Sequence, residues 1–172
     1  NGKVVGDNTD VPGLLEALHL LEVGGSPWFI AGTGGGARAA VIAAAEHGVP
    51  VAVRSRDARR QKEFETWTAA RGVSLAAASD CRVLINSTPL GLQPSDPLPI
   101  DPAGFPSAEI AFDMVYAPGE TSWIRAMKTR VRRSADGRGM LVAQGAAAFE
   151  RWFPAKRAPV EVMRAAVNVA LR

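Results

Sequence analysis

A cluster of glycines between a short apolar segment and a helix pattern of small residues most constrains this chain. Trp28–Ala31 is an uninterrupted apolar run, typical of a buried strand, and Gly32 to Gly36 follow it directly. Residues 37–47 are apolar on nearly every side, as expected of a helix that packs on a sheet. Glycines here allow a tight turn, a close approach to a pyrophosphate and close helix–strand packing. The segment therefore predicts a dinucleotide-binding strand–loop–helix unit.

Short apolar runs and amphipathic patterns keep alternating along the rest of the chain. The predicted strands span 49–53, 83–85 and 110–112, and the predicted helices span 11–23, 59–71, 121–130, 140–152 and 159–171. Thr9 or Asp10 is expected to cap the first helix, with Pro12 in its first turn. This alternation predicts an α/β fold, a Rossmann-like, doubly wound and mostly parallel sheet with helices on both faces.

Composition excludes several classes of protein. The 172 residues are 47% hydrophobic and 22% charged, which is the balance of a globular chain and not of a disordered one. The longest apolar run, residues 39–45, is far too short to cross a bilayer, so no membrane partner is expected. A lone cysteine, Cys81, excludes an intrachain disulfide framework and a cysteine-based metal site, and we expect no metal.

A basic stretch begins at Lys128 and runs to Arg138. No aromatic residue is interleaved with its arginines, and the net charge of the whole chain is only +3. We interpret the stretch as a solvated face that leads into the next helix, and we predict no nucleic-acid partner. The first residues, 1–6, have neither an initiator Met nor the apolar core of a signal peptide, so we expect an excised part of a longer intracellular protein.

The choice between NAD and NADP should be made at the end of the second predicted strand. An acidic residue there holds the ribose 2′-hydroxyl of NAD, whereas an arginine accepts the 2′-phosphate of NADP. The chain has Ser55, Arg56 and Asp57 at this corner, and Arg60 follows. Guanidinium groups bind phosphate in a bidentate manner, so NADP is favoured. Asp57 would repel a 2′-phosphate if it pointed inward, which keeps NAD as the alternative cofactor.

Four further segments resemble those of shikimate dehydrogenases and occur in that family's order. They are residues 6–10 (GDNTD), 86–91 (NSTPLG), 113–121 (the pattern D-x-x-Y-x-P-x-x-T) and 136–144 (DGRGMLVAQ). With the glycine loop they make the chain similar to the C-terminal NADP-binding domain of the family and its hinge helices. The resemblance implies a hinge segment and helix (1–23), a dinucleotide-binding domain (24–139) and C-terminal helices (140–172), with the N-terminal substrate domain absent.

The resemblance also implies roles for individual residues. Asp10 matches the active-site aspartate, which contacts the ring hydroxyls of the substrate and pairs with a catalytic lysine, and no lysine of this chain matches that lysine. Gln144 matches a glutamine that contacts the substrate, and Tyr116 a tyrosine that lines its pocket. The cofactor residues implied are Gly32, Thr33, Gly34, Gly35 and Gly36 at the pyrophosphate, Ser55, Arg56 and Arg60 at the 2′-phosphate, and Met114 and Gly137 beside the nicotinamide.

The residues alone leave other roles open. Asp10 could simply be a helix N-cap, Gln144 an exposed surface residue and Tyr116 a core aromatic. His19 and His47 have no ligand-like companions, and we interpret both as structural.

The leading hypothesis is NADP-dependent, reversible interconversion of 3-dehydroshikimate and shikimate. This would be a cytoplasmic step of aromatic amino-acid biosynthesis, on the chorismate pathway. Without the lysine-bearing domain, the chain by itself is expected to be inactive. The alternatives are a quinate/shikimate dehydrogenase that uses NAD and, in another class, a nucleotide-binding module without catalysis. A homodimer is left open.

Overall fold

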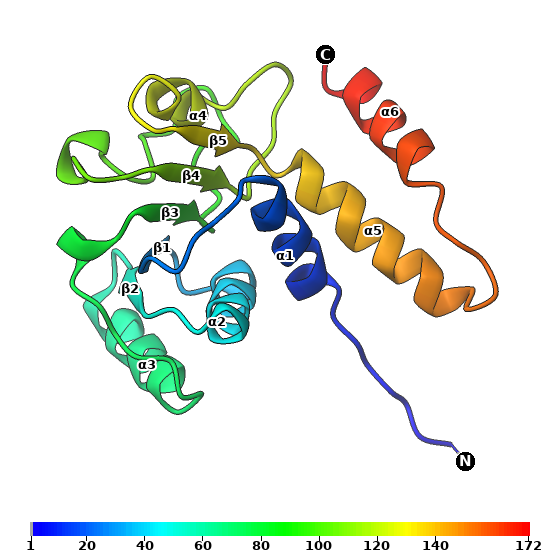
Figure 1. The fold of residues 1–172 in the computed structure, drawn as a ribbon, viewed down its shortest axis with the longest axis horizontal. Coiled ribbons are helices and arrows are strands. Elements are labelled where there is room, and N and C mark those ends of the chain that lie inside the picture. Colours follow the sequence, from blue (N-terminus) through cyan, green and yellow to red (C-terminus); the bar gives the residue numbers. More distant parts are fainter. Residues whose placement is uncertain (1) are drawn as a thin grey trace.

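The computed structural model describes residues 2–172, whose centre is a five-stranded sheet (Figure 1). The strands are β1 (Trp28–Ala31), β2 (Val51–Arg54), β3 (Val83–Asn86), β4 (Ile110–Asp113) and β5 (Arg133–Ala135). Their order across the sheet is β2-β1-β3-β4-β5, and each neighbouring pair is parallel. The predicted Rossmann-like α/β sheet is confirmed. The strand order reverses beside β1, which is the switch point of such a sheet.

All six predicted helices are present, with modest changes in length. They are α1 (Asp10–Leu20), α2 (Gly35–His47), α3 (Ala58–Ala69), α4 (Ser122–Met127), α5 (Arg138–Trp152) and α6 (Val160–Ala170). Two single 3₁₀ turns, Ala78–Asp80 and Pro102–Gly104, lie in the connections. None of the helices within 2–172 combines the length and the apolar character needed to pass through a bilayer.

The core lies on both faces of the sheet because successive strand side chains point to opposite sides. In β1, Trp28 and Ile30 lie in one buried cluster with residues of α1, α2 and α5. Phe29 and Ala31 lie in a second buried cluster, which includes Trp123 of α4. The prediction of helices on both faces is therefore confirmed.

The strand β5 corrects one prediction. The basic stretch after residue 128 is not a solvated face throughout, because Arg133–Ala135 pairs with β4 as an edge strand. Its residues are all half-buried, so it lacks the apolar run by which the other strands are recognised. Arg133 forms an ion pair with Glu22 at 2.6 Å between Nη2 and Oε2. A charged side chain is a common feature of edge strands, since it discourages pairing with another chain.

A layer of three helices lies beside the sheet (Figure 1). α1 packs along α5, and α6 packs on the outside of α5. The approach of α1 to α5 is close: a Cβ atom on Gly13 would lie 2.8 Å from the Cβ of Gln144. α6 also approaches α5 at a glycine, since a Cβ on Gly145 would lie 3.0 Å from Cε of Met163. The small residues thus set the distance between these helices.

Candidate cofactor-binding cleft

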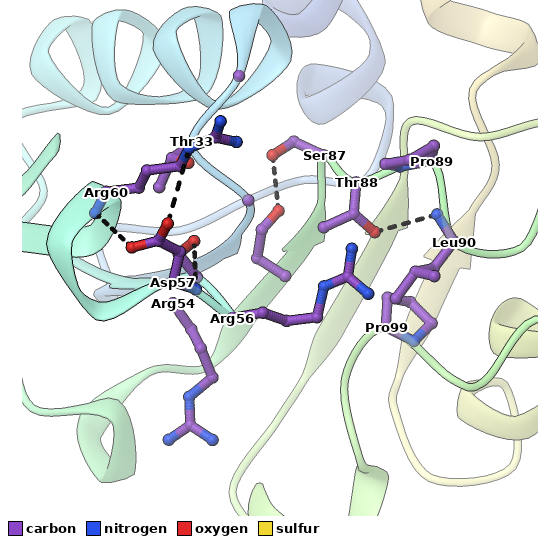
Figure 2. Close-up of a pocket in the computed structure, with 14 residues that line it drawn as sticks. Thr33, Arg54, Arg56, Asp57, Arg60, Ser87, Thr88, Pro89, Leu90 and Pro99 are labelled. Atoms are coloured by element: carbon purple, nitrogen blue, oxygen red, sulfur yellow. Dashed lines mark hydrogen bonds and ion pairs between the residues drawn. The ribbon is translucent and has the colours of Figure 1, made fainter.

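A cavity of about 540 Å³ opens at the carboxyl ends of β1, β2 and β3 (Figure 2). In an open parallel sheet, ligands bind at this edge and at the switch point of the strand order. The lining comes from the ends of the strands and the segments that follow them: residues 31–34 at β1, residues 54–57 and 60 at β2 and the start of α3, and residues 87–90 and 99 after β3. The structure therefore brings six of the predicted cofactor residues together: Gly32, Thr33, Gly34, Ser55, Arg56 and Arg60.

The first glycine of the loop is required by its backbone and by its neighbours. Gly32 has φ of +111°, a conformation that side-chain-bearing residues rarely adopt. A Cβ atom at this position would lie 2.6 Å from Oγ of Ser87. The Ser87 hydroxyl in turn donates a hydrogen bond to the carbonyl oxygen of Ala31 at 2.6 Å. Gly32 therefore lets the loop after β1 pass directly against the loop after β3.

The following glycines form the beginning of α2. Gly34 is the N-cap and the helix begins at Gly35, two residues before the predicted start. A Cβ on Gly34 or Gly35 would have no neighbour within 4 Å, so open space faces this helix end. The first N–H groups of a helix have no partner inside it, and the helix dipole gives them positive potential. This end of α2 can therefore bind an anion.

The arginine corner after β2 has two arginines that point in different directions (Figure 2). Arg56 extends across the cleft toward the side of Thr88 and Pro99, whereas the Arg60 side chain extends over Asp57 toward Thr33. Both arginines are exposed. Two guanidinium groups therefore face the cleft, one from the loop after β2 and one from the first turn of α3, and both are accessible to a phosphate.

Asp57 has a structural role at this corner. It is the N-cap of α3, and its Oδ1 accepts a hydrogen bond from the backbone N–H of Arg60 at 3.1 Å. Its Oδ2 lies 3.9 Å from Nε of Arg60, within ion-pair distance. The carboxylate that complicated the choice of cofactor is therefore partly neutralised by one of the two arginines. It still lines the cavity.

The loop after β3 forms the opposite wall and was not predicted to contain site residues. Buried Asn86 holds it, because its Oδ1 accepts hydrogen bonds from the backbone N–H of Thr88 at 2.9 Å and from the Thr88 hydroxyl at 2.7 Å. Its Nδ2 donates to the carbonyl oxygen of Leu90 at 3.1 Å. The signal in the sequence was the polar run of residues 86–88 directly after a buried strand.

A buried carboxylate lies behind this wall. Asp113 Oδ1 accepts hydrogen bonds from Nδ2 of Asn86 at 2.8 Å and from the N–H of Val115 at 3.0 Å. Its Oδ2 accepts from the hydroxyl of Thr121 at 2.8 Å. Burial raises the pKa of Asp113 to about 6, although these three hydrogen bonds act to lower it, and the Asp136 carboxylate raises it further.

Met114, Gly137 and Tyr116 gather next to the glycine loop, outside the lining of the cavity. A Cβ on Gly36 would lie 2.8 Å from Sδ of Met114. A Cβ on Gly137 would collide with the carbonyl oxygen of Met114 and lie 3.3 Å from Cδ1 of Tyr116. Tyr116 is 38% exposed, so the alternative of a core aromatic is wrong. These residues form the part of the site nearest to α5.

Asp10 and Gln144 lie at the contact between α1 and α5 and do not line the cavity. Asp10 is the first residue of α1, and Gly13 follows it by one helical turn on the same side and touches Gln144. Neither side chain forms a hydrogen bond within residues 2–172. Thr9 is at the N-cap of α1, one of the two predicted positions, but its side chain forms no capping hydrogen bond. Asn8 Oδ1 instead accepts the N–H of Asp10 at 2.7 Å.

Comparison with known proteins agrees with this architecture. The family described as "Shikimate 5'-dehydrogenase C-terminal domain" matches residues 137–167. A shikimate dehydrogenase (NADP(+)) of Archaeoglobus fulgidus is 38% identical over an alignment of 181 residues. The alignment covers 99% of this chain and 66% of the relative. The chain belongs to the shikimate dehydrogenase family.

Solved structures of shikimate dehydrogenases have the same fold. One, in complex with NADP⁺, superposes with a TM-score of 0.88 at 26% identity. The superposition covers all of this chain and 64% of that one. Another, from Thermus thermophilus in complex with NADP(H) and shikimate, superposes with a TM-score of 0.83 at 33% identity, and this superposition covers 96% of this chain and 64% of that one. The chain thus spans about two thirds of the length of these shikimate dehydrogenases and corresponds to their C-terminal NADP-binding region.

Proposed function

We propose that this chain is the cofactor-binding part of an NADP-dependent shikimate dehydrogenase, which interconverts 3-dehydroshikimate and shikimate. One observation carries the proposal: the glycine turn after β1 and the two arginines after β2 line one cavity at the switch point of the sheet. The relatives' names, shikimate dehydrogenase (NADP(+)), support the same assignment.

The residues of the cleft fit NADP. The open helix end at Gly34 and Gly35 suits the pyrophosphate, with Thr33 beside it. Arg56 and Arg60 suit the 2′-phosphate because guanidinium groups pair with phosphate oxygens. When bound, the nicotinamide supplies or accepts the hydride. We place it next to the cleft, beside Gly36, Met114 and Gly137, which are three further predicted cofactor residues, while Ser55 completes the phosphate corner.

The substrate would lie at the α1–α5 contact. The Asp10 carboxylate has no partner within residues 2–172, so it is available to a ring hydroxyl or to a cationic acid–base group. The half-buried Gln144 offers an amide on the neighbouring helix. Tyr116 would border the same space from the nicotinamide side. We assign Asp10 the catalytic role and all three residues a role in binding shikimate or 3-dehydroshikimate.

The proposal retains the division of the chain into a hinge segment (1–23), a dinucleotide-binding domain (24–139) and C-terminal helices (140–172). It also retains a cytoplasmic location for the enzyme. A second candidate is a shikimate dehydrogenase that uses NAD, which the position of Asp57 in the lining of the cavity favours. A nucleotide-binding module without turnover is the third.

Calorimetry with the purified chain separates these candidates by cofactor. We expect NADPH to bind at least about tenfold more tightly than NADH, because one added charge-assisted phosphate contact is worth about 1.5–3 kcal/mol. Equal affinities would favour the NAD-using enzyme. Failure to bind either cofactor would reject all three candidates.

Activity separates the enzyme from the binding module. We expect no shikimate-dependent NADPH formation by the chain alone, and turnover when it is joined to the part of the Archaeoglobus fulgidus relative that the match leaves out. In that enzyme, Asp10→Asn should lower kcat at least about a hundredfold, and Gln144→Ala should mainly raise KM. Glu16→Gln, an exposed position on the same helix, is the control. Turnover by the unjoined chain would contradict the expected placement of the catalytic groups.

A further inference from the structure

A second cavity adjoins the cofactor cleft, between the beginning of α2 and the helix α3. Its volume is about 360 Å³. Its lining consists of Thr33, Gly34, Arg38, Arg60, Glu63, Phe64 and Trp67. Three of these residues, Thr33, Gly34 and Arg60, also line the cofactor cleft, so the two cavities meet at the side chain of Arg60. Figure 2 shows that this side chain extends toward Thr33, which is the direction of the second cavity.

Arg38 is held in place by an aromatic side chain. Its guanidinium carbon lies 5.0 Å from the centroid of the Trp67 ring, within the range of a cation–π interaction. The ring itself stacks on Phe64, with 5.3 Å between the centroids and 24° between the planes. Phe64 is buried. Arg38 is therefore an exposed cation that rests on a platform fixed by the core, so little conformational entropy is left to lose when it binds an anion.

The carboxylates of this corner already have cationic partners. Glu63, which lines the second cavity, pairs with Arg59 at 2.8 Å between Oε1 and Nε. Asp57 pairs with Arg60. Within residues 2–172, no carboxylate lies within ion-pair distance of Arg38. The corner therefore has more positive than negative charge, and Arg38 is the group on the α2 side that an incoming anion would meet.

We infer that Arg38 is a further specificity-determining residue, which together with Arg60 holds the 2′-phosphate of NADP where the two cavities meet. Trp67 is the positioning residue that orients the Arg38 guanidinium. A phosphate monoester is a dianion with three acceptor oxygens, and two guanidinium groups on opposite helices match it. Arg56 points to the other side of the cleft (Figure 2), and because it is exposed its side chain can rotate to join these two arginines at the same phosphate. This inference rests on the proposed binding of NADP.

Calorimetry of NADPH and NADH with the whole chain tests the role of Arg38. Arg38→Gln should weaken NADPH binding about tenfold or more and change NADH binding less than about twofold. Arg71→Gln is the matched control, since the Arg71 guanidinium carbon lies 3.7 Å from the centroid of the same indole ring but Arg71 lines neither cavity. We expect it to change neither affinity more than about twofold. Arg38 is exposed, so thermal melts of both variants should match the wild type.

Arg38→Lys tests the geometry separately from the charge. A lysine keeps the positive charge but lacks the planar fork, so we expect the Arg38→Lys variant to bind NADPH less tightly than wild type and more tightly than Arg38→Gln. If wild type prefers NADPH and Arg38→Gln keeps that preference unchanged, the role of Arg38 is overturned and the proposed function stays intact. A wild type that binds NADPH no better than NADH would overturn both.

Discussion

The two walls of the cleft use polar side chains in opposite ways. On the β1–β2 side, Arg56 and Arg60 are exposed and the helix end at Gly34 faces open space. On the β3–β4 side, Asn86 and Asp113 are fully buried, and their polar atoms are occupied by hydrogen bonds to one another and to the loops around them. The wall on the β1–β2 side is therefore available to a ligand, and the wall on the β3–β4 side stabilises the conformation of the loops that form the site.

This difference separates affinity from stability. Removing an exposed cation costs the folded protein little, because surface ion pairs contribute at most about 1 kcal/mol. Removing a buried acceptor leaves its donors without partners, which costs about 1–3 kcal/mol for each neutral group. Substitutions on the first wall should therefore change cofactor binding, and substitutions on the second wall should change the free energy of unfolding.

The largest effect is expected for Asp113→Ala. Three donors, on Asn86, Val115 and Thr121, lose their acceptor inside the protein. We expect a loss of at least about 3 kcal/mol in the free energy of unfolding, measured by urea denaturation. A loss below about 1 kcal/mol would show that the buried wall is not held by this carboxylate. Asp101→Ala, an exposed aspartate that caps a short 3₁₀ turn, is the control for a lost surface carboxylate.

The pH dependence of stability tests the same carboxylate without creating a cavity. Burial raises the pKa of Asp113 from 3.8 to about 6, so the folded state binds its proton more tightly than the unfolded state. The unfolding free energy should therefore fall as pH rises from about 4 to about 6, by up to about 3 kcal/mol, and stay level for this group above that range.

Asp113→Asn should remove that slope, and the difference between the wild-type and variant curves isolates it. Asp136, whose pKa burial also raises, is present in both proteins, so most of its own contribution cancels in the difference. Parallel curves from pH 4 to 7 would contradict a raised pKa of Asp113 in the folded protein.

On the exposed wall, Arg56→Ala should weaken NADPH binding by about ten- to a hundredfold and leave NADH nearly unchanged. Calorimetry gives both affinities, and the urea midpoint should stay at the wild-type value because Arg56 is exposed. Arg132→Ala, an exposed arginine outside both cavities, is the control. Equal losses for the two cofactors would mean that Arg56 does not contact the 2′-phosphate.

The smallest effect is expected for Asp57→Asn. Asparagine is as good an N-cap as aspartate, so α3 should keep its stability. Removing the negative charge beside Arg60 should raise NADPH affinity by about two- to fivefold, with no change for NADH. A lower NADPH affinity would show instead that the Asp57–Arg60 pair is needed to orient the arginine.

Much of the fold follows from local patterns in the sequence. The glycine loop, the first four strands and the six helices were all predicted, because apolar periodicity and backbone preference act over a few residues. The edge strand β5 was missed for the same reason: its half-buried residues include Arg133 and carry no apolar run. Thr9, one of the two predicted caps of α1, is at the N-cap, but the side-chain hydrogen bond to the start of the helix comes from Asn8.

Only the tertiary structure decided which residues meet. The register of β3 against β4 places Asn86 opposite Asp113, 27 positions later, and so creates the buried wall. The packing of α2 beside α3 brings Arg38 onto Trp67. These contacts depend on strand order and helix packing, which join residues far apart in the chain and leave no periodic trace in the sequence. The sequence determined the elements and the chemistry of each loop, and the sheet determined how the loops combine into a site.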